Sequence, residues 1–161
     1  MYKHILVPTD GSELSRSAVD EALALAKALG ARVTGVHVIP SRALSSLEAW
    51  VHGSKESSSQ LAAIQKEHAR RFLTEIAVRA RAAGVRCQCR QVAGDQVYEE
   101  IIKLARTRRC DLIYMASHGR KGAADVILGS ETVKVLTHSP LPVLVHRSPE
   151  ATQRRLAGRR R

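Results

Sequence analysis

The sequence has few aromatic residues, which make up 3% of its 161 positions. They are scattered along the chain at Tyr2, Trp50, Phe72, Tyr98 and Tyr114. Proteins that bind single-stranded nucleic acid stack its bases on clustered aromatic side chains, so this scatter argues against a base-stacking platform. Long apolar runs are also lacking. No run approaches the roughly 18 residues of a membrane-spanning helix, and residues 1–8 lack the cleavage site of a signal peptide, so we expect no membrane association.

Cysteine is scarce as well, with Cys87, Cys89 and Cys110 as the three examples. An odd number without Cys-x-x-Cys spacing fits a reducing compartment better than a disulfide framework, so we expect the protein in the cytoplasm. Cys87 and Cys89 alternate on one face of a predicted strand, and we interpret them as packed thiols rather than as a redox pair.

Charge of one sign dominates, with 26 Lys and Arg against 15 Asp and Glu and a net charge of +11. Residues 147–161 hold six arginines and one acid, Glu150, and leave +6 for residues 1–146. The length suits one domain with its own core. We therefore predict a single domain over residues 1–147 and a basic, disordered tail over residues 148–161.

Short apolar runs alternate with helical patterns along this domain. Strands are expected at 3–8, 33–39, 85–92, 111–116 and 141–146, and helices at 12–29, 59–83, 94–108 and 130–138. Helices between nearly continuous apolar strands predict an α/β fold, a three-layer sandwich around a parallel sheet. Residues 41–59, seven of them serine, are expected to form a variable loop.

Two details of the helices follow from spacing. Asp10 and Glu13 have the spacing of a capping box at the start of helix 12–29. The expected buried face of helix 59–83 consists of Leu61, Ile64, His68, Phe72, Ile76 and Ala80.

A ligand site is expected at the carboxyl ends of the first and fourth strands, where open parallel sheets bind ligands. Residues 8–11 and 116–119 leave these strands. Gly119, Arg120 and the start of the helix at Gly129 and Ser130 together form a pattern typical of a phosphate cradle, because glycines and helix amides favour anions. Asp10 would accept from ribose hydroxyls or an adenine amine. The alternatives are that Asp10 and Ser130 only cap helices and that Arg120 is a solvated surface residue.

Five segments carry a resemblance to a known family. They are Ile-Leu-Val-Pro-Thr-Asp-Gly-Ser at 5–12, His-Val at 37–38, Met-Ala-Ser-His-Gly-Arg-Lys-Gly at 115–122, Leu-Gly-Ser-Glu-Thr-Val-Lys-Val-Leu at 128–136 and Pro-Leu-Pro-Val-Leu-Val at 140–145. Over residues 2–147 the sequence resembles the universal stress protein family. The resemblance implies a five-stranded sheet of order 3-2-1-4-5, Rossmann-like or flavodoxin-like, and a homodimer joined through the strand at 141–146.

The nucleotide-binding branch of that family carries Gly-x-x-Gly, nine residues, and Gly-Ser or Gly-Thr. Gly119, Gly129 and Ser130 match this motif, whereas Ala116 stands at the first glycine position. The resemblance implies bound ATP or AMP, with Mg²⁺ held through the phosphates. It assigns adenine and ribose contacts to Pro8, Thr9, Asp10 and Val38, the floor to Met115, Ala116, Gly119 and Arg120, and phosphate contacts to Gly129, Ser130, Glu131 and Thr132.

The expected function is a non-catalytic adenine-nucleotide-binding module in stress response or signalling, with an unidentified protein partner. No Walker lysine is present, so any ATP hydrolysis should be slower than roughly 1 s⁻¹. One alternative is an enzyme of the ATP-pyrophosphatase type, whose loop after the first strand is richer in glycine. Another is a nucleotide-free dimeric scaffold or a nucleic-acid-associated stress protein that uses its arginine-rich tail.

Overall fold

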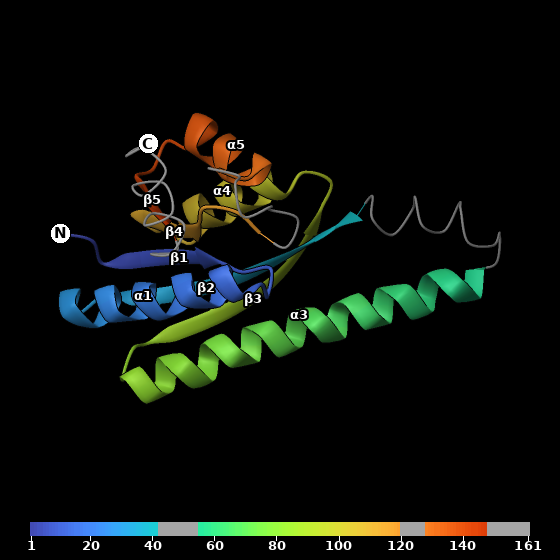
Figure 1. Ribbon diagram of the computed structural model, residues 1–161, viewed down its shortest axis with the longest axis horizontal. Helices are drawn as coiled ribbons and strands as arrows, with labels where there is room; N and C mark the ends of the chain where they lie inside the picture. The colour runs from blue at the N-terminus through green and yellow to red at the C-terminus, as the bar shows by residue number, and fades with distance from the viewer. Residues whose placement is uncertain (42–54, 120–127, 148–161) are drawn as a thin grey trace, which may run out of the picture.

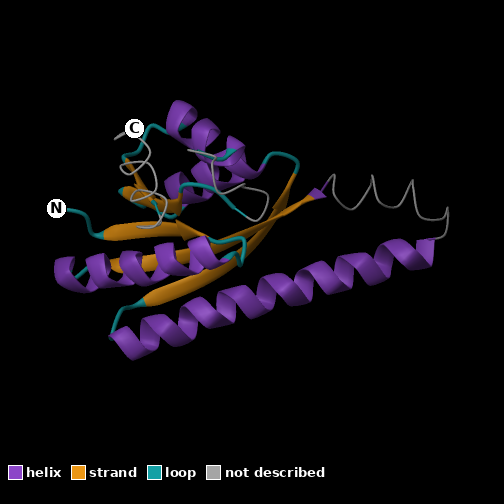
Figure 2. Ribbon diagram, viewed as in Figure 1, coloured by secondary structure: helices purple, strands orange, loops and turns teal. Residues whose placement is uncertain are grey.

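Five parallel strands form one sheet in a computed structural model that describes residues 1–41, 55–119 and 128–147. The strands are β1 (His4–Pro8), β2 (Arg32–Pro40), β3 (Cys87–Gly94), β4 (Leu112–Ala116) and β5 (Val143–His146). Their order is β3-β2-β1-β4-β5, and every neighbouring pair is parallel. The predicted fold class and strand order are therefore confirmed, and Figure 2 shows helices on both sides of the sheet.

Four described helices cover the two faces of the sheet. They are α1 (Glu13–Leu29), α3 (Lys55–Ala83), α4 (Val97–Thr107) and α5 (Ser130–His138). Figure 1 shows α1 and α3 on one side of the sheet and α4 and α5 on the other. Helix α3 begins at Lys55, so residues 55–59 belong to a helix and not to the expected loop. The rest of that loop and the predicted tail lie outside the described residues. In the part of the chain that the structure covers, no helix is long and apolar enough to cross a membrane.

The core has two halves because side chains alternate across the strands. Ile5 and Val7 face α1 and α3, whereas Leu6 faces α4 and α5. Side chains on both faces of β1 are fully buried, since Ile5 and Leu6 are each 0% exposed. Burying a side chain of this size stabilises the fold by roughly 1.5–3 kcal/mol. The continuous apolar runs in the sequence thus reflect strands covered on both faces.

Helix α3 packs on the sheet with only its C-terminal half. The expected face is wrong at Ile64, which is 51% exposed, and at His68, which is also exposed. Leu73, Ile76 and Ala80 pack in the core beneath the helix, and Ala69 is fully buried. Figure 1 shows the reason: the N-terminal part of α3 extends past the end of the sheet, so periodicity there has no surface to cover.

Candidate functional site

The carboxyl ends of β1 and β4 lie side by side, since Ile5 and Leu6 pair with Leu112 and Ile113. The segments that follow these two strands therefore meet above the sheet. Gly119 packs so closely on Asp10 that a Cβ atom on the glycine would overlap with Asp10 Oδ2. The two segments singled out in the sequence are thus brought together, and any larger residue at position 119 would displace the Asp10 carboxylate from its observed position.

Asp10 is held in place by the residue that caps α1. The main-chain N–H and the hydroxyl of Ser12 both donate to Asp10 Oδ1, at 3.0 and 2.7 Å. The hydroxyl oxygen of Ser12 also accepts from the N–H of Ser15 at 3.2 Å, as a helix N-cap does. The expected capping box on Asp10 is therefore wrong. Ser12 caps the helix, and the Asp10 carboxylate lies at the site, fixed by a short turn.

Thr9 stabilises the turn at residues 10–12 through its side chain and its carbonyl group. Its hydroxyl oxygen accepts from the N–H of Gly11 at 3.1 Å and lies 3.1 Å from Ser15 Oγ. Its carbonyl accepts from His37 Nδ1 at 2.7 Å, so that ring nitrogen carries the proton. With Thr9 only 8% exposed, its side chain holds the loop together and is not open to a ligand.

The other residues expected on the adenine side differ in exposure. Pro8, the last residue of β1, is half-buried. Val38 and Met115 are 8% and 6% exposed, and both belong to the apolar cluster under α4 and α5. They shape the base of the site chiefly through packing.

Helix α5 presents its N-terminus to this edge of the sheet. Its N-cap is Gly129, and no side chain caps it. The N–H of Gly129 donates to the carbonyl of Ser117 at 2.7 Å, whereas the N–H groups of Ser130, Glu131 and Thr132 have no acceptor among the described residues. Three such amides at the positive end of a helix dipole form an arrangement that favours an anion.

Two side chains expected to bind phosphates have other partners. Glu131 Oε2 accepts from the N–H of Tyr98 at 3.0 Å, in the first turn of α4, and Glu131 Oε1 pairs with Lys134 Nζ at 3.0 Å. Thr132 Oγ1 donates to the carbonyl of Ala116 at 3.1 Å. These side chains fix α5 against α4 and β4. What Glu131 and Thr132 offer to a ligand is their main-chain amides.

Ala116 ends β4 with its methyl group in the core. It is 8% exposed and packs in the cluster beneath α1 and α3, on the opposite side of the strand from Met115. The methyl that replaces the first glycine of the family motif therefore fills space in the protein interior. Arg120, the remaining predicted residue, lies outside the described residues.

Three residues of the site were missed in the sequence. Ser12 orients Asp10, His37 holds the carbonyl of Thr9, and Ser117 accepts from Gly129. All three residues lie inside the quoted segments, so their positions were a usable signal. His37 was not predictable as a partner of Thr9, because the two residues are 28 positions apart.

Groups suited to catalysis or metal binding are few in the described ranges. Nowhere in residues 1–41, 55–119 and 128–147 do three potential metal-ligating side chains gather. The Ser117 hydroxyl lies 3.2 Å from His118 Nδ1, but Ser117 is only 3% exposed and presents no open nucleophile. Burial raises the pKa of Cys110 to about 12, which leaves that thiol protonated. Cys87 and Cys89 pack against the core, and Cys89 Sγ donates to the carbonyl of Leu73 at 3.2 Å.

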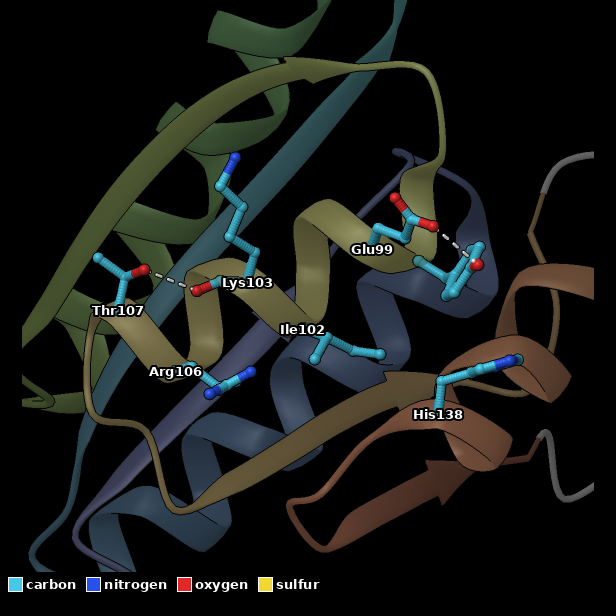
Figure 3. Close-up of a pocket in the computed structure, with 7 residues that line it drawn as sticks. Glu99, Ile102, Lys103, Arg106, Thr107 and His138 are labelled. Atoms are coloured by element: carbon cyan, nitrogen blue, oxygen red, sulfur yellow. Dashed lines mark hydrogen bonds between the residues drawn. The ribbon is translucent and has the colours of Figure 1, made fainter.

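A separate groove of about 650 Å³ runs along the outer surface of α4 (Figure 3). Its walls are surface side chains of α4, among them Glu99, Lys103 and Arg106, with His138 from α5. None of the predicted site residues lines it. This groove is therefore distinct from the site at the strand ends.

Comparisons with known proteins agree with this geometry. The profile of the Universal stress protein family matches residues 1–147. Universal stress protein MJ0531 of Methanocaldococcus jannaschii is 32% identical over 150 residues, which cover 93% of this chain and 85% of the relative. The solved structure of MJ0577 from the same organism superposes with a TM-score of 0.77 at 32% identity, covering 92% of this chain and 99% of the other. A universal stress protein solved in complex with cAMP gives a TM-score of 0.63 at 26% identity, covering 91% and 97% of the two chains.

Proposed function

The chain belongs to the universal stress protein family, and on that premise we propose that it is a non-catalytic module that binds an adenine nucleotide, ATP or AMP, in stress response or signalling. The observation that carries the proposal is the juxtaposition of the uncapped N-terminus of α5 with the oriented carboxylate of Asp10. The first feature suits phosphates, and the second suits hydroxyl or amine donors of a nucleoside. A relative of similar fold, named for its complex with cAMP, supports the adenine class.

Each residue has a stated part in this proposal. The amides of Ser130, Glu131 and Thr132, with the exposed hydroxyl of Ser130, would bind phosphate oxygens. Asp10 would accept hydrogen bonds from the nucleoside. A Cβ atom on Gly119 would overlap with Asp10 Oδ2, and one on Gly129 would crowd the main chain of His118, so the two glycines permit the observed close approach of the two loops. A Mg²⁺ ion would be held through the phosphates.

Nucleotide identity and the role of Ser130 can be tested together. We expect mass spectrometry of small molecules released from the purified full chain to identify an adenine nucleotide, and titration calorimetry to favour ATP or AMP over GTP. Ser130→Ala removes one hydroxyl donor to a charged group and should weaken binding roughly tenfold. Thr137→Ala, at the exposed far end of the same helix, is the control and should bind as the parent does. Equal affinity in all three proteins would mean that the phosphates bind elsewhere.

We also propose that two copies pair through β5. This strand is at the edge of the sheet and carries the exposed apolar side chain of Leu144, and α5, which precedes it in the chain, carries exposed Val133 and Leu136. An exposed edge beside apolar residues favours pairing with another chain. Leu144→Glu should shift the sedimentation coefficient from dimer to monomer, whereas Val78→Glu, at an exposed apolar position of α3, should leave it unchanged. A monomeric parent protein would refute the proposal.

A further inference from the structure

Cations gather at the end of the sheet opposite the candidate nucleotide site. Because the strands are parallel and connected by helices, every strand begins and every one of these helices ends at the same edge. In Figure 1 the chain enters β1 and α3 ends at this side of the molecule. We call it the amino edge. The described cations that lie there are Lys3, Lys27, Arg32, Arg81, Arg86, Arg106, Arg108 and Arg109.

Main-chain hydrogen bonds place several of them in a row. The N–H of Arg32 donates to the carbonyl of Lys3 at 3.0 Å, and the N–H of Val33 donates to the carbonyl of Arg86 at 2.8 Å. On the other side of β1, Lys3 donates its N–H to Asp111, two residues after Arg109. Neighbouring strands lie about 4.8 Å apart, so the row from Arg86 to Arg109 crosses four strands over roughly 15 Å.

No carboxylate among the described residues forms an ion pair with a cation of this row. The ion pairs among the described residues involve Arg16, Arg70, Arg71, Arg79, Lys103 and Lys134, and none of the eight amino-edge cations. Asp111 is the carboxylate at the strand starts, and its oxygens accept the main-chain N–H groups of Lys3 and His4 at 2.8 and 2.9 Å. Eight cations and one acid make a larger positive surplus than the net +6 of residues 1–146.

Helix dipoles account for only part of this cluster. Lys27, Arg81 and Arg106 lie in the last turns of α1, α3 and α4, where a cation is favourable. Lys3, Arg32 and Arg86 lie at strand starts, outside any helix. Arg109 has a φ of 55°, a left-handed conformation that glycine adopts with roughly 1–2 kcal/mol less cost. At the ends of α1 and α3, Gly30 and Gly84 have this conformation. The geometry of the turn alone therefore does not explain an arginine at position 109.

We propose that the amino edge binds the phosphate backbone of a nucleic acid, without reading its sequence. A linear row of cations matches a linear polyanion with closely spaced charges, and six of the eight cations are arginines, which suit phosphate oxygens. The absence of an aromatic cluster in the sequence leaves the bases unread. This surface is independent of the nucleotide site, which lies at the carboxyl ends of the strands.

The test compares two triple variants of the full chain that change net charge equally. In the amino-edge variant, Arg32, Arg86 and Arg109 are all replaced by glutamine. In the α3 variant, glutamine replaces three exposed cations of α3, namely Lys66, Arg70 and Arg71. Binding of a short fluorescent DNA duplex is followed by anisotropy from about 50 to 200 mM salt. The amino-edge variant should bind roughly tenfold more weakly or worse at low salt, and the slope of log K against log salt should fall by about 2–3, near 0.9 per lost contact. The α3 variant should resemble the parent, and saturating ATP should not displace the duplex.

Three further measurements distinguish loss of binding from misfolding and nucleic acid from an acidic protein. Replacing the same three arginines by lysine keeps the charge and should restore most of the binding, which shows that a loss is not due to misfolding. Thermal unfolding of each variant provides a second check. Equal DNA affinity in the two triple variants would overturn the proposal. Polyglutamate binding that equals DNA binding in the parent, with the same loss in the amino-edge variant, would overturn the nucleic-acid assignment and indicate an acidic protein partner instead.

Discussion

Replacing Gly129 by valine is expected to lower the affinity for ATP by roughly a hundredfold. A Cβ atom at this position would lie 3.1 Å from the Cα atom and 3.3 Å from the Cβ atom of His118. The branches of valine add to that crowding. The main chain of one loop must therefore move, and with it the first turn of α5. Loss of one or two hydrogen bonds to a charged phosphate, about 1.5–3 kcal/mol each, corresponds to this change in affinity.

Calorimetric titration with ATP measures the effect, and Gly129→Ala should give an intermediate value because it adds the first carbon only. Thr137→Val changes the other end of α5 and serves as the control, with no expected change in affinity. If Gly129→Val kept the parent's unfolding temperature and its ATP affinity, the N-terminus of α5 would not be the phosphate site.

Replacing Gly11 by alanine is expected to destabilise the fold by roughly 3 kcal/mol. Gly11 has a φ of 77°, which costs a residue with a Cβ atom about 1–2 kcal/mol. That Cβ would also overlap with the ring of Phe72 on α3. Overpacking of a filled site adds about 1–3 kcal/mol. For a domain of this size, the midpoint of thermal unfolding should fall by roughly 6–12 °C.

Gly30→Ala separates the two contributions to this loss. Gly30 has a similar φ of 64°, but a Cβ atom there would meet nothing within 4 Å. It should therefore lose only the backbone term, about 1–2 kcal/mol. Thermal unfolding followed by circular dichroism compares the two variants. Equal losses would show that the contact between the Asp10 loop and α3 is soft and does not help to position the carboxylate.

Local patterns in the sequence were sufficient to predict the strands and helices and their arrangement in three layers. Apolar runs such as Ile5-Leu6-Val7, separated by helical stripes, predicted parallel strands under two helical layers, and the structure confirms them. The glycine-bearing segments after β1 and β4 predicted a site at the strand ends, and Gly119 indeed lies against Asp10. The fold and the proximity of these two segments could be predicted because periodicity and turn chemistry act over a few residues, whereas ligand binding at this place remains a proposal.

Contacts between residues far apart in the sequence could not be predicted from local patterns. Glu131 bonds to Tyr98, 33 residues earlier, and this decides that its carboxylate fixes two helices together. The methyl of Ala116 is buried on the side of α1 and α3, which no motif comparison indicates. Ile64 is exposed because α3 is longer than the sheet on which it packs, which local periodicity does not indicate.

The amino acids by themselves determined which segments become strands and helices and which loops carry glycine, since each of those properties depends on neighbours along the chain. Only the tertiary structure decided which side chains remain available at the site and that cations from four separate stretches of the chain share one edge. The physical reason is that strand order and register set distances between residues far apart in the chain, and those distances determine every hydrogen bond and every unpaired charge.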